Sequence, residues 1–573
     1  MADSSSALHH LPVILCGKMK FGRIGTRETV VISAHGRTHP TSTPSTIFAA
    51  LIPKKLPSPK TITASEMDLS GFISIVLGGA RFSPSAADLE LADRSHAYLS
   101  EYANGKVIYG INTGFGPMAQ VAIPEADRRS LQYNLVRSHA SGAGADLPDE
   151  AIRAMLLVRA VTFLKGGSAV TRGVLDGLTN YLNTGVCPTV PELGGVGASG
   201  DLVQQAHLGL GLIGEGTGTY QGKKDSMSAI LKAAGVSPIE LGLRDGLAIL
   251  NGTACMTGIG LLNVHHAYRL LDHSIAMGSL LTEVLCSWDD HLSETLNGAK
   301  RHAGQREVAE RMRANIAGSK LTRDRSGHLY AGKEEVNANG VFTELVQEHY
   351  SIRCIPQILG PVLDTIRNAE KVLLDELHSV DDNPLTVADH GVFHGGNFHG
   401  DQVALEMDKL RLAVVKMCML SERQLNFLMN DKVNQRFPAF LNMERPGITL
   451  GMQGMQFTAT STTAENQALS TSLYIHSIPN NNDNQDVVSM GTNAANATAR
   501  VLNNTDRVMA IEALAVAQAV DISKAGDKLS KGGKAFYDSV RAASPAVNSS
   551  TQPAVAIEAV ERLIFRPLST WRK

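Results

Sequence analysis

The spacing of apolar positions predicts that the chain is built mainly from helices. Between Asp401 and Phe437, a stretch with neither glycine nor proline, apolar residues recur at steps of three and four. Similar helical patterns cover Ile511 to Ile522 and Asn263 to Leu285. Helices as long as the first usually pack in bundles, often across subunits. The pattern therefore predicts a mainly α fold organised around a bundle of long helices.

Composition indicates a large enzyme and argues against two classes of partner. The 573 residues are 43% hydrophobic, which is enough to form a sizeable core. A net charge of −2 and a pI near 6.8 argue against nucleic acid or an anionic membrane as partner. We find no uncharged apolar run of the roughly 18 residues that span a bilayer. The six cysteines are scattered without a C-x-x-C motif, which predicts reduced thiols and a cytoplasmic protein.

Residues 1–65 differ in composition from the rest of the chain. They contain eight Lys or Arg but only two acids, Asp3 and Glu28, and Ser, Thr and Pro cluster from Thr38 to Pro59. A segment of this composition cannot bury much apolar surface. We therefore expect residues 1–65 to be a disordered N-terminal extension.

The most informative chemistry lies in the small-residue run from Gly194 to Leu202, which contains Ala198-Ser199-Gly200. Gly200 has no side chain to block the approach of its nitrogen to the Ala198 carbonyl. If the fold compresses this turn, ring closure and loss of two waters leave a methylidene-imidazolone. This electrophile would allow an enzyme to expel ammonia from an amino acid without pyridoxal phosphate.

The same run also allows two other interpretations, a dinucleotide-binding loop and a purely structural turn. Gly195 to Gly200 spells the dinucleotide motif G-x-G-x-x-G, which needs a preceding apolar strand and an acid about 20 residues later. Pro188 and Pro191 disfavour a central strand upstream, and positions 216–222 contain no acid. The dinucleotide interpretation is therefore rejected. A purely structural turn remains the alternative on local evidence.

Five further polar groups interrupt the helical pattern. The glycine-rich loop that begins at Tyr109 suits a lid carrying a catalytic group. The spacing of Gln347, Tyr350 and Arg353 predicts that they share one helix face, where Arg353 is suited to a bidentate grip on a carboxylate. The remaining groups are Asn251-Gly252-Thr253, Gly395-Gly396-Asn397-Phe398 and the polar run Asn480 to Asp486. Taken singly, each is compatible with an ordinary loop, cap or surface.

Two groups of possible metal ligands were also considered. His394, His399 and Asp401 lie close together in the sequence, as do His265, His266 and Asp272. Neither group has the spacing of a zinc signature such as H-E-x-x-H. We predict no metal.

Taken in order, these motifs resemble the aromatic amino acid ammonia-lyases, which include histidine, tyrosine and phenylalanine ammonia-lyases and related aminomutases. The resemblance covers roughly residues 66–540, and its most specific segments are GVGASGDLVQQAHL, AILNGTACMTGIG, YSIRCIPQILGP, DDNPL, HGGNFHGD and NNNDNQDVVSMGT. The chain looks most like the bacterial tyrosine ammonia-lyases of the flavobacterial type. The resemblance implies a homotetrameric long-helix bundle of the ammonia-lyase and fumarase-like type, whose active sites combine loops from three subunits.

The resemblance also implies how the chain is divided. Residues 66–255 would form an N-terminal catalytic domain that carries the prosthetic group and the Tyr109 lid. Residues 256–540 would form the central long-helix bundle, and residues 541–573 a C-terminal tail.

Roles carry over where the motifs match. Ala198, Ser199 and Gly200 would form the methylidene-imidazolone, Tyr109 would take the β-proton, and Arg353 would bind the substrate carboxylate. A tyrosine pKa near 10 must then be lowered, and nearby helix N-termini would supply the positive potential. The other residues implied to line the site or orient the electrophile are Gly116, Ser138, His139, Asn251, Gln347, Tyr350, Phe398, Asn481 and Gln485.

Two positions bear on the substrate, which the resemblance implies is a small aromatic amino acid. Ser138-His139 resembles histidine ammonia-lyases and the flavobacterial tyrosine enzymes, whereas phenylalanine enzymes usually carry an apolar pair here. Histidine ammonia-lyases place Glu where Gln485 stands, and a neutral Gln loses the charge-assisted bond to an imidazole. We therefore predict elimination of ammonia from L-tyrosine to give p-coumarate. The alternatives are a urocanate-forming histidine ammonia-lyase, a phenylalanine ammonia-lyase or aromatic aminomutase, and a catalytically silent structural homologue.

Overall fold

A computed structural model describes residues 61–332 and 335–565. All of these residues belong to one compact unit, Phe48–Lys573. The predicted disordered extension, residues 1–65, lies outside the described residues except for its last five positions. Those five contribute to β1 (Thr61–Ile62) and to a short 3-10 turn, Ala64–Glu66.

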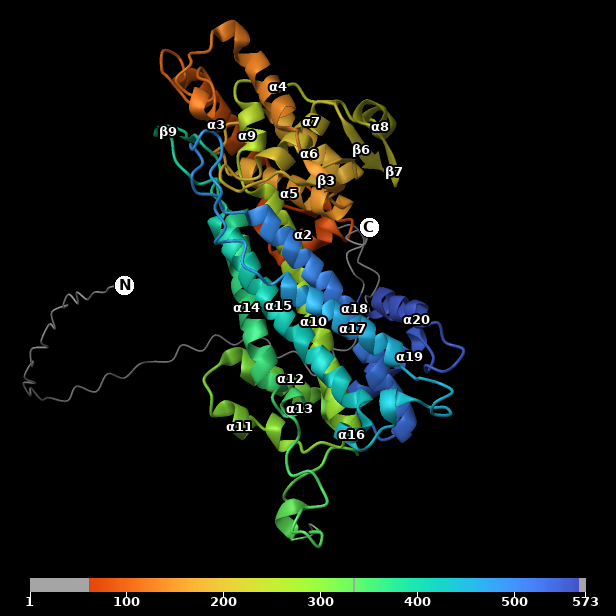
Figure 1. Ribbon diagram of the computed structural model, residues 1–573. Helices are drawn as coiled ribbons and strands as arrows, with labels where there is room; N and C mark the ends of the chain where they lie inside the picture. Colours follow the sequence, from red (N-terminus) through yellow and green to blue (C-terminus); the bar gives the residue numbers. More distant parts are fainter. Residues whose placement is uncertain (1–60, 333–334, 566–573) are drawn as a thin grey trace, which may run out of the picture. The chain divides into compact units, whose positions relative to one another are not determined.

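Long helices lying side by side form the centre of this unit (Figure 1). The helix α18 packs against α10, α15 and α17, and α14 packs against α10 and α15. Their bounds are α10 Ala254–Val284, α14 Ile355–Leu377, α15 Asp401–Met429, α17 Gln453–Ala468 and α18 Gly491–Ser523. This arrangement confirms the predicted mainly α fold and its long-helix bundle.

The predicted helix from Asp401 ends earlier than its composition indicated. Its helix α15 stops at Met429, because Asn430 leaves the helical region with φ −100° and ψ 96°. The Asn434 side-chain amide then donates to the carbonyls of Phe427 and Leu428, both at 3.0 Å. The prediction was therefore wrong beyond Met429, where a polar side chain caps the helix without any glycine or proline.

The predicted helix from Asn263 begins nine residues earlier than expected, at Ala254 in α10. Two glycines, Gly258 and Gly260, obscured this first part of the helical pattern. A Cβ atom added at Gly258 would lie 2.9 Å from the backbone carbon of Ala154 in α5 (Asp149–Leu164). This glycine therefore allows two helices to approach closely and does not end the helix.

Shorter elements gather at one end of the bundle (Figure 1). The helices there, besides α5, are α2 Leu69–Val76, α3 Ala86–Tyr102, α4 Arg128–His139, α6 Arg172–Thr184, α7 Leu202–Leu212, α8 Met227–Ala234 and α9 Asp245–Leu250. Three of the small sheets pair β1 with β2 (Arg81–Phe82), β3 (Ala143–Asp146) with β5 (Pro191–Leu193), and β4 (Cys187–Pro188) with β6 (Thr217–Tyr220) and β7 (Lys223–Ser226). The fourth pairs β8 (Leu385–Val387) with β9 (Gly391–Phe393).

The opposite end of the bundle carries α11 Glu294–Gly298, α12 Ala303–Ile316, α13 Tyr350–Arg353 and α16 Asp431–Asn434 (Figure 1). Near the C-terminus, α19 (Lys531–Ala543) and α20 (Pro553–Val560) both contact α18. The segment predicted as a tail, 541–573, thus includes a packed helix. The predicted domain boundary at residues 255 and 256 falls in the first turn of α10. None of the described helices is both long and apolar enough to cross a membrane.

A buried carboxyl in the bundle makes stability depend on pH. The Glu512 side chain in α18 is fully buried, and burial raises its pKa to about 8, against the opposing effect of Ser421. Between the usual glutamate pKa and 8 the folded state binds more protons than the unfolded state, so this contribution to stability falls as pH rises. Glu512→Gln should therefore stabilise the protein at pH 9, by at least about 1.4 kcal/mol, the equivalent of one pKa unit.

Thermal unfolding at pH 6 and pH 9 tests this expectation. The gain over wild type should be larger at pH 9, and Glu465→Gln, which removes an exposed glutamate from α17, is the control. A Glu512→Gln gain that is equal at both pH values would contradict the expectation.

Candidate active site

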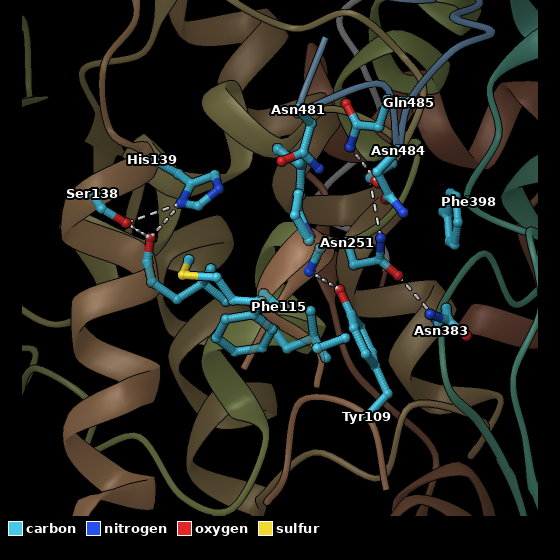
Figure 2. A pocket seen from close by; sticks show the side chains of 18 of the residues that line it. Tyr109, Phe115, Ser138, His139, Asn251, Asn383, Phe398, Asn481, Asn484 and Gln485 are labelled. Carbon is cyan, nitrogen blue, oxygen red and sulfur yellow. Dashed lines mark hydrogen bonds between the residues drawn. The ribbon is translucent and has the colours of Figure 1, made fainter. Parts of the chain in front are cut away.

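A cavity of about 520 Å³ brings together nine of the predicted site residues. They come from loops between helices and from α4, and they lie far apart in the sequence. Figure 2 shows Ser138 and His139 at one end of this cavity and Asn383 and Phe398 at the other. The nine are Tyr109, Gly116, Ser138, His139, Ser199, Asn251, Phe398, Asn481 and Gln485.

The Ala198-Ser199-Gly200 turn lies against a second glycine loop. Gly200 has a φ of +71° and pairs with Gly252 in a parallel bridge. A Cβ atom at Gly200 would lie 2.0 Å from the carbonyl oxygen of Gly252, so only glycine fits. The neighbouring Gly197 is equally confined, since its Cβ would lie 2.0 Å from Ser489 Oγ. The turn is therefore compressed from both sides by other segments of the chain.

Four helix N-termini meet at this turn. The helices α7 and α10 begin at Leu202 and Ala254, just after the two bridged glycine segments. Before α15, the Gly400 amide donates to the Gly197 carbonyl at 3.1 Å, and before α18, the Met490 amide donates to the Val196 carbonyl at 3.0 Å. Helix N-termini carry partial positive charge, so they make the potential at the turn positive.

Asp201 balances part of that positive potential. Its buried carboxylate accepts hydrogen bonds from the Met256 amide at 2.9 Å and from the Thr492 hydroxyl. Burial raises the pKa of Asp201 to about 6, and these hydrogen bonds act in the opposite direction. Asp201 thus ties the first turns of α7, α10 and α18 together beneath the Ala198–Gly200 turn.

Two amide side chains contact Ser199 from opposite sides. Gln485 Nε2 donates to Ser199 Oγ at 2.9 Å, and Asn251 Nδ2 donates to the Ser199 carbonyl at 3.2 Å. The Asn383 backbone amide donates to Asn251 Oδ1 at 2.8 Å, which determines the orientation of the Asn251 amide. A methylidene-imidazolone fits this surrounding, because the tripeptide is confined to a glycine-only turn and N–H donors already face its two serine oxygens.

Tyr109 enters the cavity from a loop shaped by glycine. Gly110 has a φ of +73°, and a Cβ there would lie 2.3 Å from Leu247 Cδ2. The Gly116 amide donates to Tyr109 Oη at 2.9 Å, and Phe115 meets the Tyr109 ring edge-on with 6.1 Å between centroids. The loop therefore holds the phenol hydroxyl inside the cavity (Figure 2).

The predicted lowering of the Tyr109 pKa is not found in the single chain. Burial raises the pKa of Tyr109 above its ordinary value, and the hydrogen bond from Gly116 opposes this only in part. The physical reason is that the phenol is half-buried beside Phe115, where a phenolate loses more hydration than one backbone N–H replaces. The prediction of a lowered pKa was therefore wrong for the isolated chain.

The end of the cavity near α4 offers a hydrogen-bond acceptor. His139 Nδ1 lies 3.0 Å from the Leu135 carbonyl, which can only accept a hydrogen bond. With its proton on Nδ1, the imidazole donates to this carbonyl and leaves Nε2 as an acceptor; Ser138 Oγ also lies 3.0 Å from Nδ1. Ser138 Oγ donates to the same carbonyl at 3.1 Å.

The predicted Gln347, Tyr350 and Arg353 group lies elsewhere in the chain. The three residues line a separate cavity of about 640 Å³, with side chains of α15 on its other wall. Arg353 Nη1 donates to Gln347 Oε1, and the guanidinium lies 4.8 Å from the centre of the Tyr350 ring. The helix α13 begins only at Tyr350, so the prediction of one shared helix face was wrong for Gln347.

The two cavities lie at opposite ends of α10. Gly252, which bridges Gly200, precedes the first residue of α10, and Trp288 follows its last. The Trp288 backbone amide and indole N–H bind the Glu348 carboxylate at 2.7 Å and the Leu345 carbonyl at 3.0 Å. A helix of 31 residues is about 45 Å long, so Arg353 cannot reach Ser199 of its own chain.

Several residues that the structure places at the site had no role predicted from the sequence. Asn383 belongs to the quoted motif DDNPL but was given no role. Arg159 and Asp381 lie beneath Asn251, and Arg159 was passed over although one arginine in the apolar run AMLLVRAVTFL is a visible signal. The other cavity residues without a predicted role are Phe115, Pro117, Met118, Ala119, Leu131, Asn134, Leu135, Leu202, Leu247 and Asn484.

The possible metal ligands do not form a cluster. Across residues 61–332 and 335–565, no three His, Cys, Asp or Glu side chains are placed to hold a metal ion. His399 Nδ1 lies 3.6 Å from Asp401 Oδ2, and His266 Nε2 lies 2.9 Å from Asp506 Oδ2 in the bundle core.

Comparison with known proteins gives a consistent result. The family model described as aromatic amino acid lyase matches residues 67–542. A MIO-dependent tyrosine 2,3-aminomutase of Streptomyces globisporus is 39% identical over 84% of this chain and 90% of its own length. A tyrosine ammonia-lyase of Cupriavidus metallidurans is 37% identical, covering 83% and 90% of the two chains. A histidine ammonia-lyase of Geobacillus kaustophilus is 38% identical, covering 80% and 87%.

The backbone agrees with a solved structure. The crystal structure of tyrosine aminomutase from Streptomyces globisporus matches with a TM-score of 0.84 at 34% identity. The match covers 89% of this chain and 97% of that one. The long-helix bundle and the small elements at its ends are thus shared as a whole.

Proposed function

Because the chain belongs to the aromatic amino acid lyase family, we propose that it eliminates ammonia from L-tyrosine to give p-coumarate. The family comprises carbon–nitrogen lyases and related aminomutases that depend on methylidene-imidazolone, abbreviated MIO. The single observation that carries the proposal is the Ala198-Ser199-Gly200 turn, confined by Gly252 and contacted by Asn251 and Gln485. The intact turn also argues against a catalytically silent homologue.

The residues around Ser199 have different roles in the proposed reaction. The MIO group would supply an electrophile that makes the substrate amine a better leaving group. Asn251 and Gln485 hold the Ser199 segment in place, and the four helix N-termini stabilise negative charge that develops there. Tyr109 takes the β-proton of the substrate, with its hydroxyl positioned by the Gly116 amide. Phe398 closes the cavity at the end where Asn383 lies.

A complete site requires more than one copy of the chain. Arg353 is suited to bind the substrate carboxylate, yet it lies a helix length of about 45 Å from Ser199. We infer that Arg353, Tyr350 and Gln347 of one subunit face the Ser199 cavity of another, within a homotetramer. The 70% exposure of Tyr350 in the single chain supports this arrangement, because a large aromatic side chain at an active site is otherwise left in water.

Tyrosine is favoured as the substrate by the acceptor on His139. A phenol O–H can donate to His139 Nε2, whereas phenylalanine leaves this nitrogen unpaired. An imidazole N–H could also donate to it, so His139 alone does not separate tyrosine from histidine. Gln485 favours tyrosine, because a neutral amide cannot form an ion pair with a substrate imidazolium.

Absorbance assays with purified enzyme test the proposal. Tyrosine should produce a growing p-coumarate band, faster than histidine produces urocanate and phenylalanine produces cinnamate. Chromatography of the tyrosine reaction separates the lyase product from β-tyrosine, the product of an aminomutase. Faster turnover of histidine, or β-tyrosine as the main product, would contradict the proposal.

Replacing His139 should change substrate preference. His139→Phe removes the acceptor for the phenol hydroxyl, so preference should shift from tyrosine towards phenylalanine by roughly 10- to 1,000-fold in the ratio of kcat/KM. Steady-state kinetics with both substrates measure this ratio. His96→Phe is the matched control, because the His96 Nδ1 likewise lies 3.0 Å from a backbone carbonyl, that of Ala169, but outside the cavity, so the ratio should stay nearly unchanged. Equal losses for both substrates in His139→Phe would show that His139 only packs beside the pocket.

Replacing Arg353 should weaken substrate binding. Lysine keeps the charge but cannot reproduce the planar bidentate grip on a carboxylate. Arg353→Lys should raise KM by roughly 10- to 100-fold, the equivalent of one charge-assisted hydrogen bond. Arg423→Lys is the control, because Arg423 lines the same cavity but pairs with Glu422. A KM that rises equally in both variants would contradict a specific role for Arg353.

A further inference from the structure

A buried ion pair lies directly beneath the proposed site. Arg159, in the middle of the apolar helix α5, is fully buried and donates from Nη1 to Asp381 Oδ1 at 2.7 Å. Removing two charges from water is costly, so stability alone is a weak explanation for such a pair. The other hydrogen bonds of Arg159 and Asp381 show which segment of the chain the pair holds.

The pair grips the Asn251-Gly252-Thr253 segment at both ends. Arg159 Nη2 donates to the carbonyl oxygens of Ala248 and Asn251. Asp381 Oδ2 accepts from the Thr253 amide at 2.6 Å and from the Thr253 hydroxyl at 3.0 Å. The peptide groups on either side of Gly252 are therefore attached to one buried ion pair.

Gly252 transmits this grip to Gly200. A Cβ at Gly252 would lie 2.3 Å from Arg159 Nη1 and 2.7 Å from Asp381 Oδ2, and its φ is +148°. On its other side the Gly252 carbonyl accepts from the Asp201 amide at 2.8 Å and blocks the Cβ position of Gly200. An unbroken series of contacts thus leads from the ion pair through Gly252 to the Ala198–Gly200 turn.

The segment that contains Asp381 also orients the Asn251 side chain. Asn383, two residues after Asp381, donates its backbone amide to Asn251 Oδ1, and Asn251 in turn donates to the Ser199 carbonyl. Movement of Asp381 would therefore displace both Gly252 and the Asn251 side-chain amide that faces Ser199.

We propose that Arg159 and Asp381 are positioning residues for ring formation, holding Gly252 as the rigid stop against which the Ala198–Gly200 turn closes. This inference rests on the proposed function. In the closing step the Gly200 nitrogen forms a bond to the Ala198 carbonyl carbon. The Ala198 oxygen leaves as water with the amide hydrogens of Gly200 and Ser199, and a second water takes the Ser199 hydroxyl and its Cα hydrogen. The step needs no oxidant or reductant.

Intact-mass measurement of full-length Arg159→Lys and Asp381→Asn tests this proposal. A lysine at position 159 cannot reproduce the hydrogen bonds to the Ala248 and Asn251 carbonyls together with the ion pair to Asp381. An asparagine at position 381 has no charge, and it presents either an N–H donor or a weaker acceptor to Arg159. A misplacement of about 1 Å can slow a reaction about 100-fold, so we expect ring formation to slow by that order. The readout is the fraction of folded chains that have lost two waters at fixed times after synthesis, with folding checked by size and thermal unfolding.

Arg411→Lys is the matched control. Arg411 forms a second buried pair, with Asp408 at 2.6 Å, but it donates to the Thr471 and Ala494 carbonyls and not to the Asn251–Thr253 or Asp381–Asn383 segments. It should lose stability but complete both dehydrations at the wild-type rate. If Arg159→Lys does not fold, Asp381→Asn decides the question, because it keeps the size and shape of the side chain.

The outcomes separate this proposal from the proposed function. Full dehydration of folded Arg159→Lys and Asp381→Asn at the wild-type rate would overturn the positioning role. Equal slowing in Arg411→Lys would also overturn it, because the effect would then be a general loosening of the fold. A wild-type protein that shows no dehydration would instead contradict the proposed function itself.

Discussion

Ser199→Ala should lower turnover of tyrosine by at least about 10³-fold, the scale seen when an enzyme loses a covalent catalytic group. Alanine has no hydroxyl to lose, so the methylidene cannot form even if the ring closes. The fold should be retained, because the Ser199 hydroxyl takes part in the hydrogen bond from Gln485 and in no ion pair or helix cap. Steady-state kinetics and intact mass together check this result, and wild type should be lighter than its sequence by two waters, within a peptide containing Ala198 to Gly200.

The control for Ser199→Ala is Ser489→Ala. Ser489, just before α18, donates to the Gly197 carbonyl at 3.1 Å, so it contacts the same turn but supplies no atom to the ring. Its variant should keep the double dehydration and most of the activity. Folded wild-type protein of unmodified mass would exclude the proposed chemistry, whatever the variants do.

Tyr109→Phe should lower kcat by about 10²- to 10⁴-fold, the usual contribution of a general base, with little change in substrate affinity. The variant removes only the hydroxyl, and the Phe115 ring still packs against residue 109. Stopped or continuous absorbance assays measure kcat and KM separately. Tyr181→Phe is the control, because it removes a hydroxyl that donates to the Gly211 carbonyl away from the cavity. A near-normal kcat in Tyr109→Phe would mean that another residue is the base.

The pH dependence of kcat/KM should also identify Tyr109 as the base. A base acts in its deprotonated form, and burial raises the Tyr109 pKa, so kcat/KM should rise with pH through the neutral range. If Arg353 of another subunit lies near Tyr109, its positive charge favours the phenolate and lowers the Tyr109 pKa. The rise of kcat/KM would then occur at lower pH than burial alone implies. Tyr109→Phe should remove this rise from its residual activity. A wild-type rate that falls steadily from pH 7 to pH 10 would contradict the assignment.

Much of the candidate site was visible in the sequence, because its chemistry is carried by short motifs. The glycine turn around Ser199 and the Tyr109 loop were predicted from residue type and local spacing, Ser138-His139 was implied by the family resemblance, and the structure gathers all three in one cavity. Predictions based on a regular helix were less successful, as the end of α15 at Met429 and the position of Gln347 before α13 show.

Three features depended on contacts that no local pattern encodes. Arg159 and Asp381 are 222 positions apart, and Thr253 and Asp381 are 128 apart, so their meeting depends on how α5 and the Asp381 loop pack around α10. The separation of Arg353 from Ser199 depends on the length of α10. The direction of the Tyr109 pKa shift depends on the burial of its ring.

The sequence by itself determined the helical class, because helical periodicity acts over a few neighbouring residues, and its motifs carried the resemblance to the family. It also marked Ala198-Ser199-Gly200 as the candidate ring-forming tripeptide, because glycine leaves its nitrogen unhindered. Only the tertiary structure decided what compresses that tripeptide and which groups share its cavity. The physical reason is that a Cβ at Gly200 is excluded by the carbonyl of Gly252, and a buried ion pair from two further segments holds Gly252 in place. Such exclusion arises only when the long helices have packed.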